Sequence, residues 1–166
     1  MITHRELPLL SSERINRDYL RISVAAPDLA SLCRPGMFFE LKAGLPSQTK
    51  RLFKPVSVFA AHDGEIAFLI KVVGPGTRAL AELQLGEPLL LTGPLGNSFP
   101  LVRGRKALLV SGGIGYPPLA WLKLVLAADN QVVHIHGGSC AADVFPCDLA
   151  YTLDGSAGSR GPVTLD

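Results

Sequence analysis

The stretch ALLVSGGIGYPPLAWL (residues 107–122) runs from an apolar strand through a cluster of glycines into an apolar helix. Its surroundings predict a βαβ unit, with strands at Lys106–Val110 and Val132–His136 joined by a helix over Pro117–Ala128. The two prolines that open this helix suit its first turn, where a missing N–H removes no hydrogen bond. A parallel sheet is therefore expected in this part of the chain.

The glycines Gly112, Gly113 and Gly115 lie between the first strand and the helix. Without side chains their amides can approach an anion closely, and the helix N-terminus adds partial positive charge. A tight strand-to-helix turn without a ligand would use the same residues, and the strict GxGxxG pattern is absent. The stretch by itself leaves both a nucleotide site and a plain turn open.

The first hundred residues read as short strands separated by turns. Tyr19–Ala26 begins with alternating polarity, residues 37–42 follow a Pro-Gly turn, and two apolar runs flank Asp63-Gly64, a strong hairpin signal. A helix is predicted over 76–85, and another strand opens the segment 87–100. Several short strands with one inserted helix predict a small antiparallel barrel.

The pattern changes at the basic segment Arg103–Arg105. We therefore predict a mixed β and α/β fold, with an antiparallel β-barrel domain at 1–102 and a partial βαβ nucleotide-binding domain at 103–166. The helix of the second domain is apolar nearly all round, so we expect it to be covered on more than one side, by a complete sheet or by a subunit interface.

Composition limits the partners. A net charge of +2 with scattered basic residues gives no extended face for nucleic acid. The N-terminus lacks the apolar core of a signal peptide, and no apolar run reaches the ~18 residues of a membrane span. We expect a cytoplasmic protein with no membrane or nucleic-acid partner. The cysteines, Cys33, Cys140 and Cys147, are then expected to be reduced, and their spacing matches no metal site.

Two further segments could hold an anion. In residues 74–83 a glycine again precedes a helix and Thr77 can cap it, although a plain N-cap uses the same pattern. The basic cluster KRLFK (50–54) is large enough for one phosphate, or it guards a solvated edge strand.

The histidines His134 and His136 are expected on one face of their strand. With Cys140 nearby a metal site is conceivable, but no acidic fourth ligand is placed, and a buried, hydrogen-bonded pair is the stronger expectation. Trp121 is expected to pack in a core or an interface.

Six short motifs follow one another along most of the chain: PGMFFEL (35–41), KPVS (54–57), LIKVVGPGT (69–77), GPLGNSF (93–99), SGGIGYPPL (111–119) and DGSAGSRGPVT (154–164). In this order they resemble the ferredoxin-reductase-like flavoproteins, and among them the electron-transfer subunits of class 1B dihydroorotate dehydrogenases.

The resemblance implies an FAD site on the barrel and an NAD(H) site on the second domain. An Arg-Pro-x-Ser strand binds FAD phosphate and ribitol in the family, one strand presents its backbone to the isoalloxazine ring, and a helix start closes on the phosphates. The positions implied for FAD are Lys54, Pro55, Val56 and Ser57, then Leu69, Ile70 and Lys71, then Gly76 and Thr77. The positions implied for the NAD(H) pyrophosphate are Gly112, Gly113 and Gly115.

The chain departs from the family in two places. Lys54 replaces an arginine and loses its bidentate fork, so we expect pyrophosphate binding to be weaker or shared with Arg51. The chain ends at Asp166, before the nicotinamide contact and the four cysteines of a 2Fe–2S cluster, and its own cysteines do not fit that spacing. We therefore expect no iron–sulfur cluster on this chain.

The implied function is electron transfer between NAD(H) and a partner through FAD, with a role in dihydroorotate oxidation and so in pyrimidine biosynthesis. The expected partner is a catalytic dehydrogenase subunit or another electron-transfer protein, in a hetero- or homo-oligomer. No side chain need act as a general acid or base, because the flavin carries the chemistry. The alternative is a flavin-binding or assembly module that does not turn over NAD(P)H.

Overall fold

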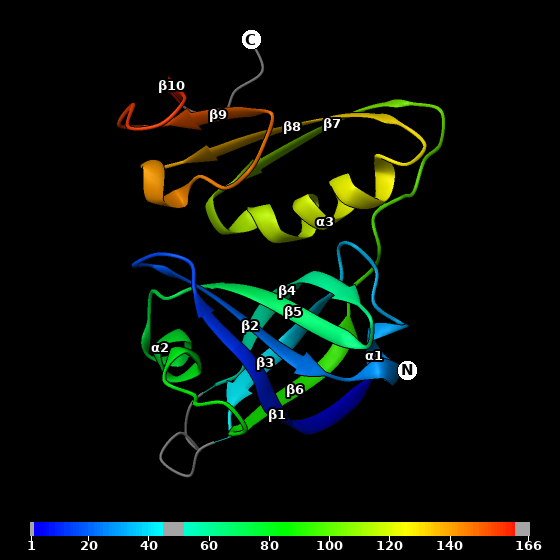
Figure 1. Ribbon diagram of the computed structural model, residues 1–166, viewed down its shortest axis with the longest axis vertical. Helices are drawn as coiled ribbons and strands as arrows, with labels where there is room; N and C mark the ends of the chain where they lie inside the picture. The colour runs from blue at the N-terminus through cyan, green and yellow to red at the C-terminus, as the bar shows by residue number, and fades with distance from the viewer. Residues whose placement is uncertain (1, 45–51, 162–166) are drawn as a thin grey trace. The chain divides into compact units, whose positions relative to one another are not determined.

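The computed structural model describes residues 2–44 and 52–161. The chain divides into two compact units, Met1–Ser98 and Phe99–Asp166, and each is described by itself (Figure 1).

The first unit is a closed barrel of six antiparallel strands in the order β1-β2-β5-β4-β3-β6. The strands are β1 (Thr3–Arg14), β2 (Tyr19–Ala25), β3 (Phe38–Ala43), β4 (Lys54–His62), β5 (Glu65–Lys71) and β6 (Pro88–Leu95). The predicted antiparallel barrel is confirmed.

The barrel interior is filled by side chains that alternate along its strands. Phe39, for example, is fully buried on β3 and meets Phe68 of β5 edge to face, with ring centroids 5.7 Å apart. A Cβ on Gly93 would lie 2.4 Å from the Phe39 ring, so glycine is what lets this ring fill the interior. The hairpin between β4 and β5 turns at Asp63 and Gly64, both with positive φ, as two-residue hairpins require.

The sequence prediction missed two elements of this unit and misplaced a third. Strand β1 gave little signal because Leu9 is the only one of its twelve residues that is buried. The short helix α1 (Pro27–Ala30) was also missed. The helix predicted over 76–85 is α2 (Pro75–Ala81), which ends earlier than predicted; a turn follows, in which the Glu87 amide donates to the Gln84 carbonyl.

The second unit is a parallel sheet in the order β10-β9-β8-β7, with one helix along one face (Figure 1). Its elements are β7 (Lys106–Gly112), the 3-10 turn η2 (Gly113–Gly115), α3 (Tyr116–Leu126), β8 (Gln131–Gly138), the 3-10 turn η3 (Ala141–Asp143), β9 (Leu149–Thr152) and β10 (Ser159–Arg160). The predicted βαβ unit is confirmed, and the short strands β9 and β10, which were not predicted, extend it.

Helix α3 packs on β7 and β8 through a small core made of Leu109, Leu122 and Leu126. On the opposite face of the sheet Leu108 pairs in register with Val133, and these side chains are 50% and 43% exposed. Leu124 on α3 is 74% exposed, so the expected cover on more than one side of this helix is incomplete within the described residues. None of the described helices is long and apolar enough to cross a membrane.

Leu122 and Leu124 allow a matched test of the α3 core. Leu122→Ala should destabilise the second unit by about 2–5 kcal/mol, because it removes a buried side chain and leaves a cavity. Leu124→Ala, on the exposed side of the same helix, should change the free energy of unfolding by less than ~0.5 kcal/mol. Urea unfolding followed by circular dichroism measures both, and equal losses would contradict this packing.

Candidate functional site

The glycine loop of the second unit follows β7 and leads directly into α3. Gly113 has φ +48°, a backbone conformation that favours glycine. Gly112 and Gly115 have φ of −135° and −74°, which any residue can adopt, and a Cβ on either would meet no atom closer than 3.9 Å. Neither backbone strain nor packing within the chain therefore explains glycine at these two positions, whereas close approach of a ligand would.

Helix α3 begins at this loop without a side-chain cap. Its first residue is Tyr116, whose amide donates to the Gly113 carbonyl, and two prolines follow, so the amides left at this helix start are those of the glycine loop. Uncapped amides at the start of a helix of this length suit an anionic group. The three glycines named from the sequence are thus brought together at the carboxyl end of β7.

The barrel gathers the other candidate residues where strands β4 and β5 stop pairing. The register between these strands runs from His62↔Glu65 to Val58↔Phe68. Lys54–Ser57 on β4 and Leu69–Lys71 on β5 lie beyond the last pair, although they still pair with β3 and β2 on their other sides. Each segment therefore presents a backbone edge to the gap between the two strands.

A bulge accompanies this separation. The β4–β5 register shifts between Val58 and Ala60, and bulges increase the local twist of a strand. Pro55 has no N–H, so β4 could not continue a full ladder on both sides at this point. The proline and the bulge together account for the opening of β4 away from β5.

The start of α2 lies against Lys54. A Cβ on Gly76 would lie 2.3 Å from Cε of Lys54, so the lysine stem crosses directly over this glycine. A side chain at position 76 would displace the end of the Lys54 side chain. This contact joins β4 to the turn after β5, and it places the Lys54 side chain beside the first turn of α2.

Thr77 orders the turn itself. Its hydroxyl accepts hydrogen bonds from the amides of Val73 (3.0 Å) and Gly74 (3.1 Å), and it donates to the Gly74 carbonyl (3.1 Å). One donor and two acceptors are all that a hydroxyl offers. Any contact of Thr77 with a ligand therefore falls to its backbone. The N-cap of α2 is Gly74, so Gly76 and Thr77 lie within the first turn.

The Lys71 side chain lies against β2. Its ammonium lies 5.2 Å from the ring centroid of Tyr19, a fully buried residue on β2. This cation–π contact holds the side chain toward β2. Lys50 and Arg51, which the sequence analysis added to the basic cluster, lie outside the described residues.

The histidines and the buried cysteine that the sequence analysis considered are explained by the packing of the protein. His134 and His136 are both fully buried and hydrogen-bonded, as expected from their strand. No group of three or more His, Cys, Asp or Glu side chains within 2–44 and 52–161 is arranged to hold a metal ion. Burial raises the pKa of the Cys33 thiol to about 11, which makes it a poor nucleophile.

Curated proteins similar to this chain include electron transfer subunits of dihydroorotate dehydrogenase B. The chain is 43% identical over 138 residues to the dihydroorotate dehydrogenase B (NAD(+)), electron transfer subunit, of Clostridium acetobutylicum, a match covering 79% of this chain and 55% of that protein. It is 30% identical to the subunit of the same name from Bacillus mycoides, over 99% of this chain and 68% of that protein. The chain belongs to this family. It spans 55–57% of the length of the relatives from Clostridium acetobutylicum, Bacillus velezensis and Desulforamulus reducens, and about two thirds of the length of the Bacillus mycoides relative. No family model matches it.

Two solved structures share the fold of this chain. An NADH-dependent reduced ferredoxin-NADP oxidoreductase matches with a TM-score of 0.80 at 24% identity, over 93% of this chain and 59% of that one. The ferredoxin reductase of carbazole 1,9a-dioxygenase matches with a TM-score of 0.78 at 24% identity, over 96% and 54%. The family and fold predicted from the six motifs are confirmed.

Sequence reasoning missed the register that makes the barrel site. The resemblance named Lys54–Ser57 and Leu69–Lys71, but nothing in the sequence indicated that both segments lie where strands β4 and β5 stop pairing. Pro55 inside a strand was the available signal, since proline cannot donate to a ladder. The link between Ser111 and the two histidines was also missed, because it requires the parallel register of β7 and β8.

Proposed function

We propose that this chain is the electron-transfer component of a dihydroorotate dehydrogenase, with FAD on the barrel and NAD(H) on the α/β unit. Membership of the family supports this proposal, as do the names of its relatives. The observation that carries it is the break between β4 and β5, where a lysine, a serine and two backbone edges come together. The domain roles predicted for 1–102 and 103–166 follow from it.

The residues at the break fit the parts of FAD. Lys54 supplies a positive charge, and Ser57 supplies a hydroxyl, for the phosphate and ribitol. The edge of Leu69–Lys71 offers backbone donors and acceptors of the kind that match the polar rim of an isoalloxazine ring. The first turn of α2 leaves its backbone amides for the phosphates.

The residues of the second unit fit a pyrophosphate. Gly112 and Gly115 leave open space where a side chain would lie, and α3 begins there without a side-chain cap. FAD, when bound, accepts a hydride as an electron pair and can release the electrons one at a time. The chain itself binds and orients the two groups, and no side chain at either site is required to move a proton.

The partner is a catalytic dehydrogenase subunit in a hetero-oligomer that oxidises dihydroorotate for pyrimidine biosynthesis. A location in the cytoplasm, the absence of nucleic-acid and membrane partners, and the absence of an iron–sulfur cluster from this chain stay predictions.

The alternative is a flavin-binding or assembly module that does not turn over NAD(P)H. The exposed apolar face of the β7–β10 sheet, with Leu108 and Val133, favours it, because such a face suits a docking partner.

Reconstitution separates these functions. Protein refolded with excess FAD and then desalted should retain flavin absorption, and anaerobic NADH should bleach it. Retained flavin that NADH does not bleach would favour the binding module. A colourless protein of native circular dichroism would contradict both.

Lys54→Ala should weaken FAD binding about tenfold or more, since charged hydrogen bonds contribute about 1.5–3 kcal/mol. Titration of apoprotein with FAD, followed by quenching of flavin fluorescence, measures the change. Lys106→Ala is the matched control, because this exposed lysine begins β7 in the other unit. Equal affinity of the Lys54→Ala variant and wild type would remove Lys54 from the site.

Gly115→Leu should block NADH while sparing the fold. The position has a helical φ of −74° and open space for a side chain, so the free energy of unfolding should change little. A leucine would occupy the space that a pyrophosphate needs, and flavin reduction by NADH should slow at least tenfold with FAD still bound. Stopped-flow bleaching measures the rate. Unchanged reduction would show that the glycine loop does not bind NADH.

A further inference from the structure

A chain of buried polar side chains lies directly beneath the glycine loop. Ser111, two residues before Gly113, pairs in register with His136 on β8, and His134 lies on the same face of that strand. The Ser111 hydroxyl oxygen is 2.7 Å from Nε2 of His134 and 2.7 Å from Nδ1 of His136. All three side chains are buried, both histidines completely.

The hydrogen positions in this cluster follow from its partners. Nε2 of His136 lies 2.8 Å from the Asp143 carbonyl oxygen, which can only accept, so this nitrogen carries a hydrogen. Nδ1 of a neutral His136 is then an acceptor, and the Ser111 hydroxyl must donate to it. Because a hydroxyl has one hydrogen, Ser111 must accept from Nε2–H of His134. The hydrogen bonds run one way, from His134 through Ser111 and His136 to Asp143.

One atom of the cluster has no partner. Nδ1 of His134 is buried and makes no hydrogen bond. The ring of Tyr116, the first residue of α3, stacks on the His134 ring at 5.5 Å with an interplanar angle of 10°. The Tyr116 hydroxyl is turned away to the Pro146 carbonyl, 2.9 Å distant. The lone pair on Nδ1 is therefore enclosed among groups that offer it no hydrogen.

The cluster ties three segments to the loop. Ser111 fixes the end of β7, Tyr116 fixes the start of α3, and Asp143 belongs to η3. The Asp143 carboxylate also accepts from the Ser139 amide at 3.1 Å. The backbone of the glycine loop thus has a polar anchor at one end and an aromatic anchor at the other.

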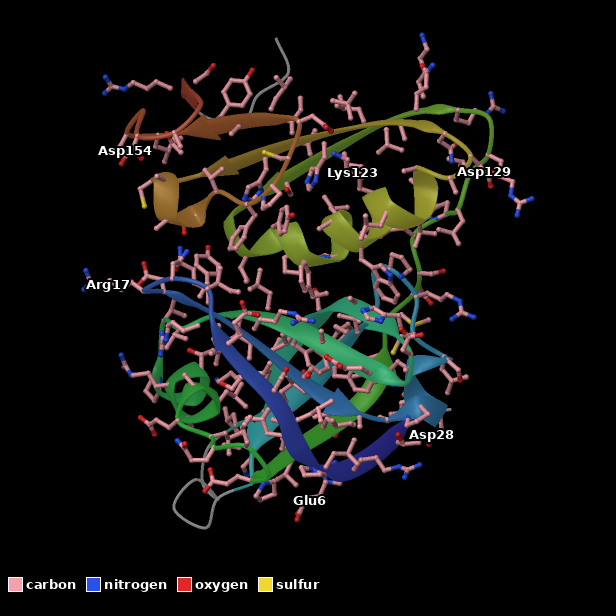
Figure 2. All side chains as sticks on the ribbon, in the orientation of Figure 1. Glu6, Arg17, Asp28, Lys123, Asp129 and Asp154 are labelled. Atoms are coloured by element: carbon pink, nitrogen blue, oxygen red, sulfur yellow. The ribbon has the colours of Figure 1, made fainter. Side chains whose placement is uncertain are left out.

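Few charges face the two rings. Lys123 on α3 projects toward the sheet and donates to the Asp148 carboxylate at 2.7 Å (Figure 2). That carboxylate also accepts from the His134 amide at 2.6 Å, so it serves the backbone and not the ring. The other titratable groups around the rings are Tyr116, Asp143 and Cys147.

Burial is the main cause that lowers the pKa of both histidines below the ordinary value of 6.5. For His134, the neighbouring His136 and Lys123 lower the pKa further, while Asp148 opposes them. For His136, hydrogen bonds to the backbone of Asp143 and Ser111 and the charge of Asp143 raise the pKa and so oppose the effect of burial. Both rings are neutral at pH 7, as the hydrogen-bond chain requires.

We propose that Ser111, His134 and His136 form an acid-sensitive latch, which orders the glycine loop while both imidazoles are neutral and releases it when either is protonated. A proton on Nδ1 of His134 would be buried without an acceptor. A proton on Nδ1 of His136 would make Ser111 accept from both rings and leave its own hydrogen unused. The latch is a property of the α/β unit and holds whichever ligand the loop takes.

The sign of the pH effect follows from linkage. As the pH falls through 6.5, the unfolded chain takes up protons that the folded cluster resists, so acid favours unfolding. The ratio of folded to unfolded protein should fall by up to about tenfold per pH unit for each histidine, and by up to about a hundredfold for the pair. Above that pH these two groups contribute no pH dependence.

Trp121, the one tryptophan of the sequence, lies on α3 and reports on this unit. Urea unfolding of the full chain, followed by Trp121 fluorescence between pH 7.5 and 5.5, measures the proton uptake. His134→Gln keeps an N–H donor toward Ser111 but cannot titrate, so it should remove about half of the cluster's acid dependence. His62→Gln, at an exposed site on β4, is the control and should leave the dependence unchanged.

Loop order is read by hydrogen exchange of the Tyr116 amide, which donates to the Gly113 carbonyl across the loop, corrected for the intrinsic effect of pH. Wild type should lose protection there on acidification, and His134→Gln should lose less. Ser111→Ala should lose protection already at pH 7.5, since it breaks the chain between the rings. If His134→Gln keeps the wild-type acid dependence, or if Ser111→Ala leaves the loop protected, the proposal is wrong.

A measurement on the wild type guards against variants that fail to fold. In an NMR titration, two of the four histidine rings should stay neutral as the pH passes below 6.5. Titration of all four near that pH would overturn the latch. None of these measurements involves FAD or NADH, so failure of the latch and failure of the proposed function are distinguishable.

Discussion

Strands β4 and β5 pair only as far as Val58 and Phe68, and the candidate barrel site depends on this limit. If the ladder continued, the backbone groups of Lys54–Ser57 would hydrogen-bond to those of Leu69–Lys71 and would not be available to a ligand. The bulge after Val58 turns β4 aside, and Pro55 lacks a donor for a continued ladder. Closure of the barrel elsewhere lets the fold tolerate one open seam, because the remaining strand pairs keep these segments in place.

A different constraint applies to the α/β unit. The polar side chains of Ser111, His134 and His136 lie beneath the glycine loop, and the proposed function requires the loop amides to be free for a ligand. His134 and His136 lie buried on this sheet, and His136 is hydrogen-bonded at both ring nitrogens, whereas His134 is hydrogen-bonded at Nε2 alone. Ser111 bridges them at the residue before the glycines. The same bonds that satisfy the rings hold the loop, which is why its order should depend on their protonation.

Much of the fold was predictable where local signals agree with tertiary packing. Asp63-Gly64 fixed a hairpin because both residues adopt positive φ, and the alternation from strand to helix to strand predicted the parallel pair β7 and β8. Strand β1 was not predictable because it buries only Leu9 and is held by its neighbours β2 and β6. Helix α2 ended at Ala81, although apolar residues continue at helical spacing to Leu85, and the last part of that predicted range is a turn.

The sequence alone determined the family, the two kinds of unit and the identity of the candidate residues, because ordered motifs and turn chemistry are local. Tertiary structure alone decided which residues meet. Lys54 crosses Gly76, the two strand edges share one seam, and Ser111 joins two histidines more than twenty positions away. Strand register and close packing determine these contacts. Both depend on how segments distant in the sequence pack together, which a local sequence pattern does not show.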